Sequence, residues 1–304
     1  MTQLLNALPG ALAQGLIWGV MAIGVYITYK VLDIADLTVD GSIYTGAAVC
    51  TMLLLGGQSP WLALLCAVLA GVLAGAVTGL LHVGLGIPPI LVGILTQMVL
   101  WSVNLKLLGK ANQALPARTT PVLLSQMDVG GALPVLLGFC VVLVALLVLF
   151  FGTELGCALR ATGCNPVMSR AQGVNTGLMK VIGLALSNGV VALSGALLCQ
   201  YQGYTDVNMG RGAVVIGLAA VVIGQAVLGR RGGRMAVQLG GVILGAVIYY
   251  IVYQVIIFAG FDTDLLKMFS AVVVAVFLGA PHVKAQLKAH SRSKKGDSGH
   301  AKNE

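Results

Sequence analysis

The chain has 304 residues, of which 58% are hydrophobic and only 9% are charged, and its formal net charge is +8. Soluble domains carry about a quarter charged residues, so this composition excludes an ordinary soluble enzyme. Several apolar runs reach about 20 residues, the length of helix that crosses the hydrocarbon core of a membrane. The positive charge lies beside these runs and at the end of the chain, which argues against a nucleic-acid-binding protein.

Apolar windows between polar breaks predict an all-α transmembrane bundle of about nine spans. The predicted spans are 10–29, 36–56, 61–82, 88–108, 132–152, 177–200, 212–229, 235–259 and 265–281. The second is expected to be broken, because it begins with polar residues. The first lacks a basic leader, so we expect it to be retained rather than cleaved. Residues 1–281 are therefore predicted to form the transmembrane domain, followed by a basic, disordered cytoplasmic tail at 282–304.

Lysine and arginine placement predicts the orientation, because cytoplasmic loops of membrane proteins are enriched in both residues. If the tail is cytoplasmic, counting spans backwards places thirteen of the eighteen basic residues inside. The inside segments include Lys30, the loop at 154–175 and the arginines at 230–234, whereas Lys106 and Arg211 lie outside. The pattern indicates an N-terminus outside and a C-terminus inside.

The loop at 154–175 contains the clearest local signals. The fifth helix is expected to continue into this loop and to stop at Gly163 in a left-handed conformation. Asn165 and Pro166 then suit the cap and first position of a new helix, and Gly173 suits its end. A helix of about two turns is unstable alone in water, so we expect it to dock on a partner. The residues predicted to carry this contact are Arg160, Gly163, Asn165, Pro166, Val167, Met168, Arg170 and Gly173.

The spacing G-x-x-x-R-A-x-G-x-N-P-x-x-x-R-x-x-G-[IV]-N, from Gly156 to Asn175, resembles the coupling loop of ABC importer permeases of the branched-chain amino acid and ribose type. Residues 36–49 and 216–229 are similar to two pore segments of that family, and TVDGS within the first resembles an amino-acid-type subgroup. The resemblance implies a bacterial plasma-membrane permease subunit that passes a small solute inward, most simply an amino acid. It also implies two ATP-binding subunits, a solute-binding protein outside and a second permease copy, forming a homodimer.

The energy that drives transport is expected to come from a separate polypeptide. It has no P-loop and its histidines show no metal spacing, so we expect no cofactor or metal here, with ATP and Mg²⁺ held by the partner. An ion-coupled secondary transporter is the alternative function, but such proteins usually keep an ionisable residue deep in a span. Here no acid lies in the middle of an apolar run. An intramembrane enzyme is disfavoured because no nucleophile has an evident base partner.

Polar entries to two predicted spans indicate where a solute would pass. DLTVDGS, from Asp36, and DVNMGRG, at 206–212, each place an acid before a glycine and a small-residue helix. Opposed entries of this kind are typical of inverted repeats with discontinuous helices. The residues predicted to lie near the pathway are Asp40, Ser42, Tyr44, Gln97 and Asn188. The GxxxG patterns at 71–79 and 241–245 indicate close helix contacts, either within one subunit or between two.

Overall fold

The computed structural model describes residues 2–116, 120–228 and 234–258, three isolated positions at 268, 272 and 275, and side chains from residue 7 onward. Apart from those three positions, the predicted ninth span at 265–281 lies outside the described residues. The predicted tail at 282–304 and the loop at 259–264 lie outside them as well.

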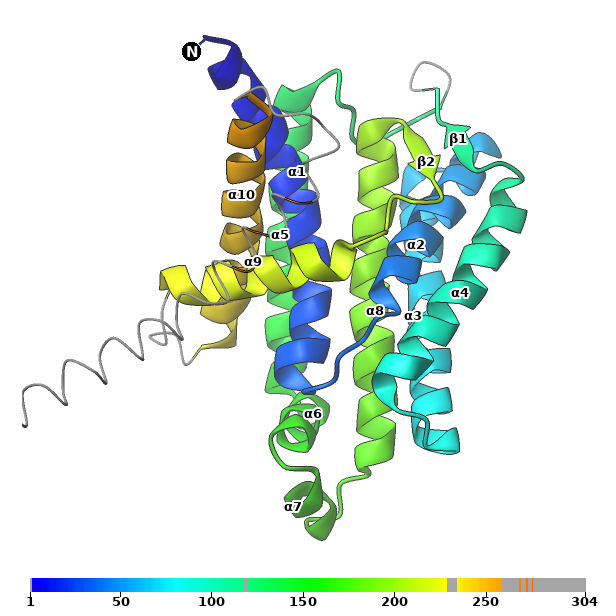
Figure 1. Cartoon of the computed structure of the whole chain (residues 1–304), viewed down its shortest axis with the longest axis vertical. Helices are drawn as coiled ribbons and strands as arrows, with labels where there is room; N and C mark the ends of the chain where they lie inside the picture. The colour runs from blue at the N-terminus through cyan, green and yellow to red at the C-terminus, as the bar shows by residue number, and fades with distance from the viewer. Residues whose placement is uncertain are drawn as a thin grey trace, which may run out of the picture.

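Six described helices are long and apolar enough to cross a membrane. They are α1 (Thr2–Tyr26), which continues into the short π-helix η1 (Ile27–Val31), α3 (Pro60–Leu85), α4 (Pro89–Leu108), α5 (Val129–Gly152), α8 (Thr176–Gln202) and α10 (Met235–Phe258). Two apolar helices are shorter, α2 (Val39–Leu55) and α9 (Ala213–Leu228). Figure 1 shows α9 lying across the long axis of the molecule. The prediction of a polytopic helical bundle is confirmed, but nine full-length spans are not found among the described residues.

Helix α8 lies at the centre of the bundle and packs against α1, α2 and α3 (Figure 1). Hydroxyl groups on α8 bond to carbonyl groups of α1. Ser194 donates to the Ile17 carbonyl at 2.7 Å, and Ser187 donates to the Gly24 carbonyl at 2.8 Å. In hydrocarbon such groups need an internal partner, so these bonds fix α1 and α8 in one register.

Both GxxxG patterns serve packing within this subunit. A Cβ atom added at Gly75 would lie 2.8 Å from the carbonyl carbon of Leu184 on α8, and Gly71 and Gly79 are closed off by the same helix. On α10, Gly245 lies against the Ala220 backbone of α9. Small residues let helix backbones approach closely in membranes, and here the approach is internal. The alternative of a subunit interface at these glycines is therefore not supported.

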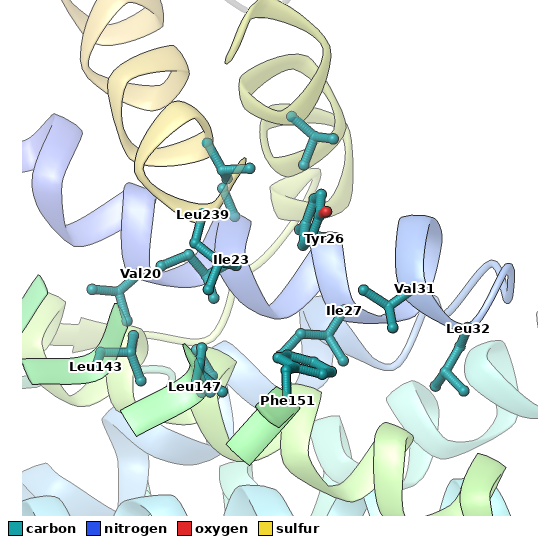
Figure 2. Close-up of a cluster of buried hydrophobic side chains, with 14 of the residues drawn as sticks. Val20, Ile23, Tyr26, Ile27, Val31, Leu32, Leu143, Leu147, Phe151 and Leu239 are labelled. Carbon is teal, nitrogen blue, oxygen red and sulfur yellow. The ribbon is translucent and has the colours of Figure 1, made fainter. Parts of the chain in front are cut away.

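A hydrophobic cluster fixes the end of α5 beside the end of α1. Figure 2 shows ten labelled members drawn from α1, the adjoining chain to residue 32, α5 and α10. They are Val20, Ile23, Tyr26, Ile27, Val31, Leu32, Leu143, Leu147, Phe151 and Leu239. The loop that follows α5 therefore starts from a fixed point beside the end of α1.

Two short helices, α6 (Glu154–Cys164) and α7 (Pro166–Ala171), form one end of the molecule. At the opposite end, β1 (Asn112–Ala114) pairs antiparallel with β2 (Tyr204–Asp206) (Figure 1). A hydrogen bond of 2.6 Å between the hydroxyls of Thr51 and Thr205 joins β2 to α2.

Candidate functional site

Helix α7 is built as the local sequence predicts. The side-chain oxygen of Asn165 accepts hydrogen bonds from the backbone N–H groups of Val167, at 3.1 Å, and Met168, at 3.0 Å. Pro166 occupies the first helical position, where its missing N–H costs nothing. Gly173 has a φ of +84°, which glycine adopts without strain. The predicted capped helix between Asn165 and Gly173 is therefore present.

The predicted role of Gly163 as a left-handed stop is wrong. Helix α5 ends at Gly152, and α6 starts afresh after Thr153, whose hydroxyl accepts from Gly156 N–H at 3.3 Å. Helix α6 then runs through Gly163, which has no positive φ. A threonine followed by a glutamate is a common helix start, so Thr153-Glu154 was the signal that could have revealed this break.

Gly163 instead allows a backbone contact. A Cβ atom there would overlap the carbonyl oxygen of Val31 and lie 3.0 Å from Cα of Leu32. Helix α6 thus packs directly on the chain that leaves η1, with no side chain between them.

The two faces of α7 differ in exposure. Val167 is 76% exposed and Met168 is 59% exposed, whereas Ser169 is buried against the rest of the chain. Arg170 does not point freely outward, because its Nε donates to the hydroxyl of Thr176 at 2.7 Å. Arg160, on α6, is exposed and lies 3.3 Å from the sulfur of Cys157. The 154–175 loop therefore presents an apolar tip, and Arg170 holds that tip to the start of α8.

Asp40 joins two helices that begin near each other. It lies in the first turn of α2, and its carboxylate accepts hydrogen bonds from the N–H groups of Gly212 and Val214, each at 3.0 Å. These N–H groups lie at the start of α9, where no carbonyl of the same helix can accept from them. A carboxylate at a helix N-terminus is also favoured by the helix dipole. We call this contact of Asp40 with residues 210–214 the α2–α9 junction.

A buried polar network lies beside the junction. Asn188 on α8 donates to the Asp36 carboxylate at 2.8 Å, and its amide oxygen accepts from the Ser42 hydroxyl at 2.6 Å. Asp36 is 6% exposed, and Ser42 and Asn188 are fully buried. Of the predicted pathway residues, Ser42 and Asn188 are thus in direct contact. The sequence shows Asp36 just before the TVDGS motif but does not predict that it belongs to this group.

Two other predicted pathway residues line the same stretch of α2 without joining the network. The Cα atom of Gln97 on α4 lies 3.2 Å from the position of a Cβ on Gly41. Tyr44 is buried one turn beyond Asp40, and its hydroxyl has no hydrogen-bond partner among the described residues. The five predicted residues therefore cluster around the first turns of α2. Within the described part of the chain, no group of three or more His, Cys, Asp or Glu residues could hold a metal ion.

Comparisons with known proteins agree with this architecture. The family model described as branched-chain amino acid transport system / permease component matches residues 8–280. A tyrosine transport system permease protein of Clostridioides difficile is 37% identical over 93% of this chain and 94% of its own length. An uncharacterised protein of Rickettsia prowazekii is 33% identical, over 91% and 98%. The autoinducer 2 import system permease of Escherichia coli is 29% identical, over 67% and 60%. No solved structure matches.

Proposed function

We propose a function from one premise: the chain belongs to the family of branched-chain amino acid transport system permeases. It is the permease component of an ABC transport system, a multi-pass membrane protein whose relatives are transport subunits rather than enzymes. That premise replaces the alternative of an ion-coupled transporter. Permeases of this family work with ATPase subunits and often with binding proteins. Beyond this, we propose that residues 1–281 act as one permease unit and that the tail at 282–304 is a separate basic segment.

The observation that carries the coupling role is the exposed apolar tip of α7. Val167 and Met168 project from a helix that Asn165 caps and that Arg170 ties to α8. An apolar tip on a short, fixed helix suits insertion into a groove of a partner. We propose that the ATPase subunit supplies this groove, that the 154–175 loop is cytoplasmic, and that the β1–β2 end faces the binding protein outside. Two ATPase subunits would then serve a homodimer of this chain, in which nine spans per copy are expected.

The pathway is proposed to run beside the first turns of α2. Asp40, Ser42, Tyr44, Gln97 and Asn188 gather there, and α2 and α9 both begin there rather than crossing the whole bundle. Half-length helices that begin inside a membrane protein are typical of solute pathways.

The proposed solute is an amino acid with an aromatic side chain. Support comes from the name of the Clostridioides difficile relative, a tyrosine transport permease that matches along 94% of its length. Uptake of radiolabelled tyrosine into proteoliposomes that contain the chain, its ATPase and its binding protein tests this class. Leucine and ribose serve as competitors of other classes, and competition by ribose but not by phenylalanine would reject the proposed solute.

Site-directed cross-linking tests the coupling role. Cys157 and Cys164 are exposed, so both are first replaced by serine. Val167→Cys is then treated with a short thiol-to-amine cross-linker in the assembled complex, and Met127→Cys is the matched control. Met127 is 88% exposed and lies two residues before α5. The N–H of the neighbouring Gln126 donates to the Tyr201 carbonyl, shortly before β2. A cross-link to the ATPase from position 167 and none from position 127 is expected; the reverse result would refute the assignment.

A further inference from the structure

A nine-residue stretch of chain, residues 32–40, contacts both the 154–175 loop and the α2–α9 junction. It leaves η1 at Leu32, runs outside any helix to Thr38 and enters α2 at Val39. We call this stretch the connector. Its first residues touch α6, and its last residue holds the start of α9.

At its first end the connector has no room to slide past α6. The Gly163 backbone lies against Val31 and Leu32, and the Leu32 side chain is buried. A Cβ atom added at Gly183 of α8 would meet both Leu32 and, at 3.2 Å, the Leu159 side chain of α6. Leu32 is therefore enclosed between α6 and α8. Because packed protein interiors resist compression, a shift of α6 displaces this residue.

Between its ends the connector is fastened to the preceding helix. The N–H of Leu32 donates to the Ile27 carbonyl, and the N–H of Ile34 donates to the Thr28 carbonyl, each at 3.0 Å. Asp33 has a φ of +56°, an uncommon conformation for a residue other than glycine. The π-helix η1 precedes it, and such turns occur often at functional sites. The start of the connector is thus held by backbone hydrogen bonds to η1, and it bends at Asp33.

At its second end the connector is held by buried polar contacts. Asp36 accepts from the N–H of Thr38 at 2.8 Å and from the side chain of Asn188 at 2.8 Å. The Thr38 hydroxyl lies 3.1 Å from the Thr78 hydroxyl of α3. Two residues later, Asp40 caps α9. Asp36 therefore lies only four residues before the α2–α9 junction, and a displacement of Asp36 is passed to Asp40 over that short distance.

We propose that the connector transmits movement of the 154–175 loop to the start of α9. Gly163 of α6, which contacts the first end of the connector, and Asp36, four residues before its last residue, act as positioning residues. This rests on the proposed function, because the input is the docking of the ATPase on α7. The inference adds a specific route for this movement within the permease. The route runs through the non-helical residues 32–38 before α2, and not along α8 alone.

The test measures solute taken up per ATP hydrolysed in the reconstituted three-component system. Gly163→Ala and Asp36→Asn are each expected to lower this ratio by about tenfold, a size typical of coupling between sites, while position 167 still cross-links to the ATPase. Gly152→Ala is the matched control for the glycine, since a Cβ there meets nothing within 4 Å. A merely structural role would lower uptake and ATP hydrolysis together and leave the ratio unchanged.

A distance measurement adds a direct readout of movement. Spin labels at Arg211→Cys, within the junction, and Met127→Cys, before α5, are placed in the background in which Cys157 and Cys164 are serine. The distance between them is expected to change when ATP is trapped with vanadate, and Asp36→Asn is expected to abolish that change. Normal ratios and normal distance changes in both variants would overturn the proposal. If Gly163→Ala does not assemble, Asp36→Asn decides alone. If complexes that carry Val167→Cys but neither Gly163→Ala nor Asp36→Asn give no cross-link to the ATPase, the proposed function fails and the connector fails with it.

Discussion

Asn188 donates its amide hydrogen to the Asp36 carboxylate at 2.8 Å, across 152 residues of sequence. The same side chain accepts from Ser42 at 2.6 Å, so one amide on α8 satisfies a buried acid and a buried hydroxyl. The central helix is therefore bonded both to the connector and to α2. Loss of this amide would remove the hydrogen bond of the buried Ser42 hydroxyl and one of the bonds to the Asp36 carboxylate, which would keep the bond from the Thr38 N–H.

Asn188→Ala is expected to lower the free energy of unfolding by about 3 kcal/mol, because buried polar groups left unpaired lose their hydrogen bonds without regaining water. The measurement is the thermal unfolding of the purified protein in detergent. Ser102→Ala is the control, because Ser102 is exposed and bonds only to its own helix. The control should change the unfolding free energy by less than about 0.5 kcal/mol. Equal shifts in both variants would contradict the prediction.

Asp40→Ala should expose the first amides of α9 to exchange. Loss of a capping carboxylate costs about 1 kcal/mol, so hydrogen exchange at residues 212 and 214 should accelerate by about fivefold. Asp128→Ala removes the comparable cap of α5, where Asp128 accepts from Gly131 N–H at 3.0 Å. That variant should accelerate exchange only at α5. Unchanged exchange at 212 and 214 in Asp40→Ala would show that the junction contributes nothing to α9.

Gly75→Ala should destabilise the single subunit without changing its association. The added methyl group would press on the Leu184 backbone of α8, and overpacking of this kind costs about 1 to 3 kcal/mol. Gly138→Ala, where a Cβ meets nothing within 4 Å, is the matched control. Thermal unfolding measures the loss of stability, and light scattering after size exclusion measures the association of the subunits. Dissociation of an otherwise stable oligomer would point instead to a subunit contact at this glycine.

Asn165→Ala should unwind α7, whereas Asn165→Asp should preserve it, because aspartate offers an equivalent capping oxygen. A helix of six residues has little stability apart from its cap and its contacts. Proteolysis after Arg170 by trypsin should therefore be faster in the alanine variant, by about fivefold for a loss near 1 kcal/mol. Equal cleavage rates in Asn165→Ala and Asn165→Asp would show that the cap does not hold the helix.

Local signals in the sequence are enough to predict α7. Its cap, its proline and its final glycine all lie within nine residues, so neighbouring atoms alone decide the conformation. Membrane residence was equally accessible, because helix length and apolar content follow directly from composition. Ser42 and Asn188 are each predicted near the pathway, but the sequence does not predict the hydrogen bond between them.

Other features depend on contacts between distant segments. Gly163 reads as a helix stop in isolation, but its role is set by Val31 and Leu32, which the sequence does not place beside it. Likewise α9 is as apolar as a full span, and only its packing turns it across the bundle (Figure 1). Asp40 was expected near a pathway, yet its capping of α9 depends on where residues 212 and 214 come to lie.

The pairing of β1 with β2 makes two distant loops a single structural unit. Asn112, Gln113 and Ala114 stand opposite Asp206, Thr205 and Tyr204, so each strand holds the other in register. Chimeras that exchange only residues 109–131, or only residues 200–211, with those of a relative would separate a matched pair. Under the proposed docking of a solute-binding protein at this end, we expect a transplant of its preference between permeases to require both segments together.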